Sequence, residues 1–385
     1  MKKLMAIAVI LSIVTFCIAC VPKKNQTDSA VDAPISSIMP LLGSWIIDVD
    51  GDVMFDPQTS GLKYDNGYLY SLSDASADAS QILRLHQISL NNSQVIKKIG
   101  PTIFSERVKS SCFYDYLANK PDYEGLAPIN GEDGAWIFVT EDASRSRQLS
   151  EACQKMYAKT GSTVYPTLLV RLQVKDENLE VTHVRPVQFS VEAQVGDFPN
   201  DGIEGLAFTK DNRLLLGLEK DENKQPRIFE IAVDDHFWQE SGFAKVRDSQ
   251  LWLPNFEQGN HPINGMDVFY PTPSSQGYLL AAARNDNELW IVDLAKQKLT
   301  KRIKLAFSAP SNITQDKTHS VCETTHLMNN ASIEGIAVAN DHVWMVNDPW
   351  KVNYLKNIVC PEDKYRYQKM APLLFKMKID DTWFD

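Results

Sequence analysis

Apolar and polar positions alternate along most of this chain, in short runs separated by polar turns. Residues 204–234 (EGLAFTKDNRLLLGLEKDENKQPRIFEIAVD) are the clearest case. An apolar run is followed by a turn at Asp211 and Asn212, a second run ends in acidic residues, and a third run follows a loop. Short alternating runs bounded by Asn- and Asp-containing turns predict β-strands rather than helices.

The same succession occurs five times. Residues 124–142 and 334–348 repeat it closely, and residues 60–74 and 264–286 repeat it more weakly. The copies share a glycine near the start, at intervals of 60 to 80 residues: Gly61, Gly125, Gly205, Gly265 and Gly335. Repeats of this length, each with about four short strands, are typical of β-propellers.

The repeats therefore predict an all-β fold, a β-propeller with five blades. Six blades is the alternative, because residues 175–200 or 236–260 have room for a degenerate copy. The last copy supplies three strands, and residues 44–49 (SWIIDV) form an unassigned strand before the first copy. We expect this N-terminal strand to close the final blade, since closure removes an exposed sheet edge.

The N-terminus has the pattern of a bacterial export signal. Lys2 and Lys3 precede an apolar run over residues 4–19, which is short for a bilayer span. Residues 17–20 (CIAC) resemble a lipobox that ends in Cys20, although cysteine stands where leucine is usual. Acylation of Cys20 is the expectation, and plain secretion with an unmodified Cys20 is the alternative.

These signals divide the chain into three parts. We expect a signal peptide over residues 1–19, a polar tether over 20–40 anchored in the lipid bilayer through acylated Cys20, and the propeller over 41–385. Val21 is not acidic, so the signal for inner-membrane retention is missing. The expected location is the cell envelope, as an outer-membrane lipoprotein that faces the periplasm or the exterior.

Composition and charge narrow the classes of partner. The chain has 385 residues, 44% of them hydrophobic, and a formal net charge of −10. An acidic body without a long basic patch argues against nucleic-acid binding. We expect a monomer that binds an anionic ester substrate or another protein of the envelope.

Four cysteines follow the signal peptide. Cys112 and Cys322 each lie 13 residues before a repeat glycine, and Cys153 and Cys360 follow the same glycines by 28 and 25 residues. Because the two pairs occupy equivalent places, we expect the disulfides Cys112–Cys153 and Cys322–Cys360, as is usual in exported proteins. A metal site is the alternative, but these four cysteines have no Cys-x-x-Cys spacing and no histidines at matching spacing.

The repeats also bring acidic residues to one mouth of the central channel. The first strand of a blade lines the channel, so the residues that precede the repeat glycines, here called head residues, form a ring. The head residues are Ser60, Glu124, Glu204, Asn264 and Glu334. The second strands run back and end at the same mouth. The expected ligand-binding residues are Glu124, Glu141, Asp142, Glu219, Arg284 and Asp348.

Carboxylates at such density need counter-charge or protons. Calcium takes six to eight oxygen ligands in flexible geometry, so we expect Ca²⁺ at Glu124, Glu204 and Glu334. Protonated carboxyls poised for acid–base chemistry are the alternative, with Glu204 and Glu334 as the candidate catalytic residues. In a third reading the glutamates are purely structural and accept backbone N–H bonds from neighbouring blades.

The repeated (I/Y)-E-G-(L/I)-A motif, its polar turn and its acidic strand end resemble the phytase-like propeller family known as "esterase-like activity of phytase". The resemblance covers roughly residues 45–380 and is carried best by 123–142, 203–221 and 333–348. It implies a calcium-dependent propeller of the periplasm or exterior that hydrolyses phosphate or other esters. The matching positions are Glu124, Glu141, Asp142, Glu204, Glu219, Glu334 and Asp348. Ser60 and Asn264 depart from the pattern.

Two classes of function remain open on this sequence. One is a hydrolase that acts on phosphate or other esters at the channel mouth with calcium. The other is a non-catalytic lipoprotein that binds a ligand or a protein partner on the face of the propeller.

Overall fold

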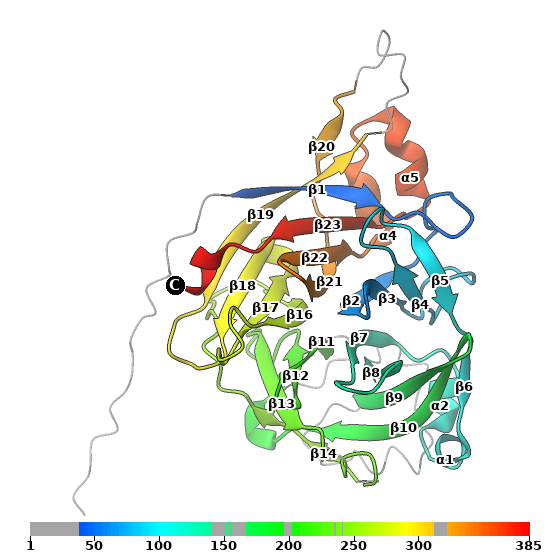
Figure 1. Ribbon diagram of the computed structural model, residues 1–385, viewed down its shortest axis with the longest axis vertical. Coiled ribbons are helices and arrows are strands. Elements are labelled where there is room, and N and C mark those ends of the chain that lie inside the picture. The colour runs from blue at the N-terminus through cyan, green and yellow to red at the C-terminus, as the bar shows by residue number, and fades with distance from the viewer. Residues whose placement is uncertain are drawn as a thin grey trace, which may run out of the picture. The chain divides into compact units, whose positions relative to one another are not determined.

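The computed structural model describes residues 38–140, 151, 155, 167–195, 202–234, 236–240, 242–311 and 322–385. The predicted sites Cys20, Glu141, Asp142 and Cys153 lie outside these residues. The described residues form a five-bladed β-propeller, whose first strands surround a central channel (Figure 1).

Each blade is a four-stranded antiparallel sheet, numbered here in chain order. Blade 1 consists of β2 (Thr59–Asp65), β3 (Tyr68–Ser73), β4 (Leu85–Ile88) and β5 (Val95–Ile99). Blade 2 consists of β7 (Tyr123–Pro128), β8 (Ala135–Thr140), β9 (Leu168–Lys175) and β10 (Asn178–Gln188). Blade 3 consists of β11 (Ile203–Phe208), β12 (Arg213–Leu218), β13 (Arg227–Ala232) and β15 (Arg247–Asp248).

The last two blades are joined into one sheet. Blade 4 consists of β16 (Ile263–Phe269), β17 (Tyr278–Ala283), β18 (Glu288–Asp293) and β19 (Lys301–Pro310). Blade 5 consists of β21 (Ile333–Ala339), β22 (His342–Asn347), β23 (Leu373–Lys378) and β1 (Met39–Trp45). Three short strands extend the blades: β6 (Thr102–Phe104) and β14 (Ala244–Lys245) pair with β10, and β20 (Thr325–Leu327) pairs with β19.

The predicted N-terminal closure is confirmed, with a shift in its bounds. The strand β1 begins at Met39, five residues before the predicted start at Ser44. Its last three residues pair antiparallel with β23, and its first four pair parallel with β19. The chain then leaves the sheet, because Ile47 bridges to Val53 and to Gln94 of blade 1. The strand β1 therefore completes blade 5 and also ties it to blade 4.

The two segments considered for a sixth blade belong to the blades already counted. Residues 178–188 form the outer strand of blade 2, and the short strands at 244–245 and 247–248 extend blades 2 and 3.

Helices are short and lie in the connections. They are α1 (Glu106–Lys109), α2 (Tyr114–Ala118), α4 (Lys351–Tyr354) and α5 (Lys364–Gln368), with 3₁₀ turns η1 (Val191–Ala193), η2 (Arg284–Asp286), η3 (Leu355–Asn357), η4 (Pro361–Asp363) and η5 (Asp381–Phe384). A disulfide joins Cys322 to Cys360, which is in the connection that contains α4 and α5. Cys112 is also disulfide-bonded, and its predicted partner lies outside the described residues. No helix among the described residues is long and apolar enough to cross a bilayer.

The repeat glycines make the close approach of neighbouring blades possible. A Cβ on Gly335 of blade 5 would lie 2.5 Å from the backbone nitrogen of Leu62 in blade 1. A Cβ on Gly265 would lie 2.8 Å from the nitrogen of Ile336, and one on Gly125 2.8 Å from the carbonyl oxygen of Glu204. Side chains at these positions would push the blades apart, so the glycine of each Glu-Gly pair has a packing role.

The head residues are set apart by an irregularity of the backbone. In every blade the register between the first and second strands shifts at the head residue. In blade 3, for example, Ile203 pairs with Leu218 and Gly205 with Gly217, so the register shifts by one residue at Glu204. A β-bulge of this kind changes the direction of a side chain and is common beside functional sites.

The outer edge of blade 4 holds the C-terminal segment. Lys298 donates to the carbonyl oxygen of Phe384 at 2.6 Å, and Arg302 pairs with Glu288 at 2.7 Å.

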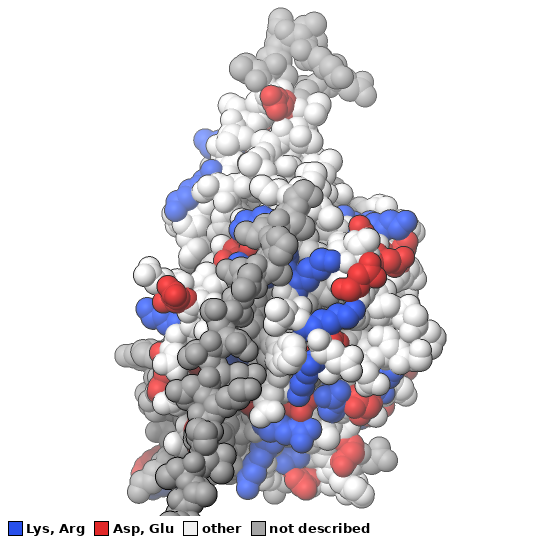
Figure 2. All heavy atoms as spheres, turned by 90° about the vertical axis from the view of Figure 1, so that its left-hand side faces the viewer, with Lys and Arg blue, Asp and Glu red and all other residues white. Residues whose placement is uncertain are grey.

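On the side of the molecule seen in Figure 2, Lys and Arg side chains lie among Asp and Glu side chains. The described part of this side is therefore of mixed charge.

Candidate functional site: the acidic mouth of the channel

One arginine lies among the glutamates that the repeats predict at the mouth. Arg284 follows the last residue of β17 and forms ion pairs with Glu334 and, at 3.2 Å, with Glu219. Glu204 is also close enough to act on its charge. Burial disfavours the charged guanidinium, but the carboxylates of Glu334, Glu204 and Glu219 outweigh burial and raise the pKa of Arg284. A single cation of blade 4 thus joins blades 3, 4 and 5.

The pKa of Glu334 is raised despite this ion pair. Burial is the largest cause, since Glu334 is 7% exposed, and the charge of Glu219 adds to it, while Arg284 acts in the opposite direction. Asn264, the head residue of blade 4, is 1% exposed and lies close enough to lower the pKa of Glu334. Neither amide atom of Asn264 has a partner of ordinary hydrogen-bond geometry among the described residues.

A second group of carboxylates lies beside blades 1 and 2. Oxygen atoms of Asp74, Asp122 and Glu124 all lie within 4.8 Å of one another. Asp74 also accepts backbone hydrogen bonds from Ser76 at 2.5 Å and Ala77 at 3.1 Å. Burial and the charge of Asp122 nevertheless raise the pKa of Asp74 to about 7. Carboxylate oxygens that converge in this way are the ligands that calcium prefers.

Asp348 lies near both groups, since charges from each act on its carboxyl. Burial raises its pKa well above the ordinary value, and the charges of Glu334 and Asp74 add to that effect. Its Oδ1 atom is buried, and none of the described residues is its hydrogen-bond partner. The two groups and Asp348 together are called the acidic mouth below. Its residues are Asp74, Asp122, Glu124, Glu204, Glu219, Arg284, Glu334 and Asp348.

The structure divides the three glutamates predicted to share calcium. Glu204 and Glu334 lie near Arg284, whereas Glu124 lies with Asp74 and Asp122. The sequence pattern missed Asp122, which precedes Glu124 by two residues and has no acidic equivalent in the other Glu-Gly copies. The available signal was the local sequence Asp-Tyr-Glu-Gly, which places two carboxylates on alternate positions.

The channel is closed below the acidic mouth. The space enclosed by the first strands is only about 10 Å³, which is about the volume needed for one water molecule. Lys63 of blade 1 crosses the channel, donates to the carbonyl oxygen of Met266 and lies 3.4 Å from Asp267 of blade 4. Asp267 also accepts the backbone N–H of Val338 in blade 5 at 2.7 Å. Among the described residues, these contacts fill the channel below the head residues.

The other group of potential metal ligands in the described residues is Cys322, Cys360 and Glu362. The two sulfur atoms form the disulfide, so neither is a thiolate available to bind metal. This leaves Asp74, Asp122 and Glu124 as the candidate cation site.

No family model and no curated protein matches this sequence. Among solved structures, the chain is similar to a putative exported protein from Bacteroides fragilis NCTC 9343, at 10% identity over 91% of this chain and 98% of that chain, with a TM-score of 0.36. It is also similar to an exo-β-1,3-galactanase from Clostridium thermocellum, at 10% identity over 87% and 61%, with a TM-score of 0.42. An auxiliary nutrient binding protein from Bacteroides thetaiotaomicron VPI-5482 matches at 9% identity over 87% and 71%, with a TM-score of 0.37. Similarity at this level concerns the fold and assigns no activity.

Proposed function

We propose that this chain is an exported, lipid-anchored β-propeller that hydrolyses anionic esters at its acidic mouth with the help of calcium. The observation that carries the proposal is the convergence of the oxygens of Asp74, Asp122 and Glu124 within 4.8 Å. A divalent cation there would allow Asp74 to ionise fully at neutral pH. When bound, calcium supplies Lewis-acid polarisation of an ester oxygen.

The residues near Arg284 supply the acid–base part of the proposal. A general acid or base works best when its pKa lies near the working pH. Burial moves the pKa of Glu334 in that direction, and Glu204 lies close enough to Arg284 for its charge to raise the pKa of that arginine. Arg284 fits the role of orienting an anionic ester group, since its guanidinium already binds carboxylates.

Features of the sequence support the proposed class of substrate and the proposed location. The Glu-Gly repeat is similar to that of phytase-like propellers, which favours phosphate esters over other esters. The signal peptide and Cys20 support attachment to the outer membrane. Mass spectrometry of the N-terminal peptide tests this part of the proposal: acylated Cys20 is expected, and a free thiol there would indicate plain secretion.

A non-catalytic lipoprotein that binds a ligand or protein on this face is the second candidate. The narrow channel favours it, because the space lined by the head residues Glu204, Asn264 and Glu334 is only about 10 Å³. Trp350 and Val352, close in sequence to Asp348, are 55% and 75% exposed and offer apolar contact area for a partner.

Hydrolysis assays on the purified full chain separate the two candidates. The substrates are p-nitrophenyl phosphate, bis-p-nitrophenyl phosphate and p-nitrophenyl butyrate, each with calcium and with EGTA. We expect calcium-dependent hydrolysis of a phosphate ester, reduced at least tenfold in Asp122→Asn and in Glu334→Gln. Glu177→Gln, which alters an exposed carboxylate in the β9–β10 turn, is the matched control. Equal rates with calcium and EGTA on every substrate would favour the binding protein.

A further inference from the structure

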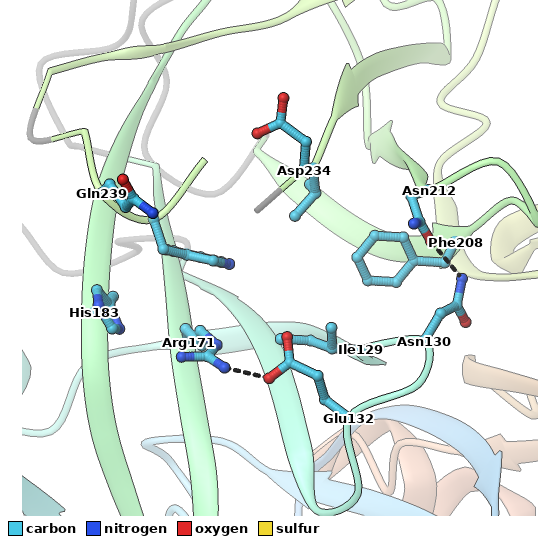
Figure 3. Close-up of a pocket in the computed structure, with 11 residues that line it drawn as sticks. Ile129, Asn130, Glu132, Arg171, His183, Phe208, Asn212, Asp234 and Gln239 are labelled. Carbon is cyan, nitrogen blue, oxygen red and sulfur yellow. Dashed lines mark hydrogen bonds and ion pairs between the residues drawn. The ribbon is translucent and has the colours of Figure 1, made fainter. Parts of the chain in front are cut away.

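A larger cavity, of about 290 Å³, lies between blades 2 and 3. It is lined by the β7–β8 turn, by β9 and β10, by the end of β11 and by the segment after β13 (Figure 3). The strands β7 and β11 begin at the acidic mouth and run away from it, so the turns that follow them lie at the opposite end of the blades. The cavity is therefore separate from the acidic mouth.

The inner surface of the cavity is partly apolar. Ile129, Phe208, Val233 and Trp238 line it, and all four belong to or pack against the core between blades 2 and 3. Trp238 also lies beside a cavity histidine, with 6.1 Å between its ring centroid and that of His183. Aromatic rings on a rigid core present a fixed apolar surface to a ligand.

Two buried nitrogen atoms in the wall have no hydrogen-bond partner among the described residues. They are Nε of Arg171 and Nδ1 of His183. Arg171 uses its terminal nitrogen to pair with Glu132, as Figure 3 shows, so its Nε–H remains for another acceptor. Leaving a buried polar atom unpaired is unfavourable, so a ligand oxygen that pairs with it would gain affinity.

The charge around the cavity disfavours an anionic ligand. Glu132 already neutralises Arg171, and Asp234 adds a second carboxylate to the lining. Burial, with the charges of Arg107 and Arg171, lowers the pKa of His183 to about 4, so its imidazole is neutral at pH 7. The amides of Asn130, Asn212 and Gln239 also line the cavity, and Asn130 donates to Asn212 at 3.2 Å.

We propose that this cavity binds a neutral carbohydrate about one sugar ring in size. A pyranose has an apolar face of C–H groups for Phe208 and Trp238, and hydroxyl groups that both donate and accept hydrogen bonds. Small rotations of the two side chains would bring these buried nitrogens to the cavity surface, where a sugar oxygen accepts from Nε of Arg171 and a hydroxyl pairs with Nδ1 of His183. The volume lies at the small end of the range for ligand pockets, which limits the occupant to one residue of a glycan.

Saturation-transfer NMR and calorimetry on the full chain test the proposal. The neutral probes are the methyl glycosides of galactose, glucose, mannose and xylose, and the anionic probes are inorganic phosphate and acetate. We expect one or more of the neutral glycosides to bind, with affinity weakened about tenfold by Arg171→Lys, which keeps the positive charge but removes Nε–H. His183→Ala should weaken the same probe by a similar factor.

Two control variants show whether a loss of affinity is specific to the cavity. Glu177→Gln, an exposed change of one carboxylate, and Asp122→Asn at the acidic mouth should both leave glycoside affinity unchanged. The proposal is overturned by an absence of binding of all four glycosides, by binding of phosphate or acetate in their place, or by glycoside binding that neither Arg171→Lys nor His183→Ala affects. Because the controls include a mouth residue, failure here is distinguishable from failure of the proposed hydrolase.

Discussion

The central channel contains charged side chains at two levels, and the levels differ in balance. At the acidic mouth, three head residues are glutamates, and Asp74, Asp122 and Asp348 lie nearby. Three residues further along each first strand, the charges are a single pair, Lys63 and Asp267. A buried pair that balances one to one holds blades together. An excess of carboxylates leaves negative charge that a bound cation would neutralise.

The two levels also alternate between blades. The three copies with a head glutamate have alanine three residues later, at positions 127, 207 and 337. The two copies without it, with Ser60 and Asn264 as head residues, have Lys63 and Asp267 instead. The two blades that lack the head glutamate therefore carry the charged pair that closes the channel. The three blades that have it contribute glutamates to the acidic mouth.

The largest effect is expected where the balanced pair is broken. Asp267→Ala leaves the ammonium group of Lys63, 5% exposed, without its carboxylate, and should reduce the free energy of unfolding by about 3–5 kcal/mol. Burial removes water from the ammonium group and thereby lowers the pKa of Lys63, so the charged form depends on Asp267. Urea unfolding measures the loss. The double variant Lys63→Met with Asp267→Leu should recover most of it, and an equally unstable double variant would show that the pair is not the cause.

Removing the cation of the acidic mouth should have a smaller effect that depends on pH. Arg284→Met leaves Glu219 and Glu334 without their counter-charge, at a cost of about 3 kcal/mol above neutral pH. The pKa of Glu334 is raised in the folded state, so its proton stabilises the fold at low pH and this contribution is lost as pH rises. The deficit of the variant should therefore grow between pH 5 and pH 8. A deficit that is constant over this range would contradict the account.

The glycine of the Glu-Gly pair should matter through packing alone. Gly335→Ala places a Cβ 2.5 Å from the nitrogen of Leu62 and should lower the free energy of unfolding by about 1–3 kcal/mol. Gly242→Ala is the matched control, since a Cβ there meets nothing within 4 Å, and its effect should be about 0.5 kcal/mol or less. Thermal melts of both variants compare them. Equal losses would mean that the close contact between blades 5 and 1 is not the cause of the destabilisation.

Much of the fold was predictable, because period-two alternation and the repeated glycines report directly on strands and on the ring of blades. The start of β1 was missed by five residues, since pairing with β19 is a long-range property that no local pattern records. The pairing of Arg284 with Glu219 and Glu334 was predictable only as proximity at one mouth. The candidate cation site was harder to predict. Asp122 lies outside the repeat, and only the fold brings it close to Glu124 and Asp74.

The pairing of Lys63 with Asp267 could not be predicted from the sequence for a related reason. Lys63 and Asp267 are about 200 residues apart and belong to blades that are not neighbours in the ring. Their meeting depends on the diameter of the channel, and that diameter follows from the number of blades and the glycine contacts between them.

Calorimetric titration of calcium into the purified full chain tests directly whether the acidic mouth holds a cation at Asp74, Asp122 and Glu124. We expect one site per chain, weakened at least tenfold by Asp122→Asn and unchanged by Glu177→Gln. Because the pKa of Asp74 is about 7, binding near neutral pH should release a proton, seen as a heat that depends on the buffer's ionisation enthalpy. No calcium heat at millimolar concentration, or a heat that Asp122→Asn leaves intact, would contradict it.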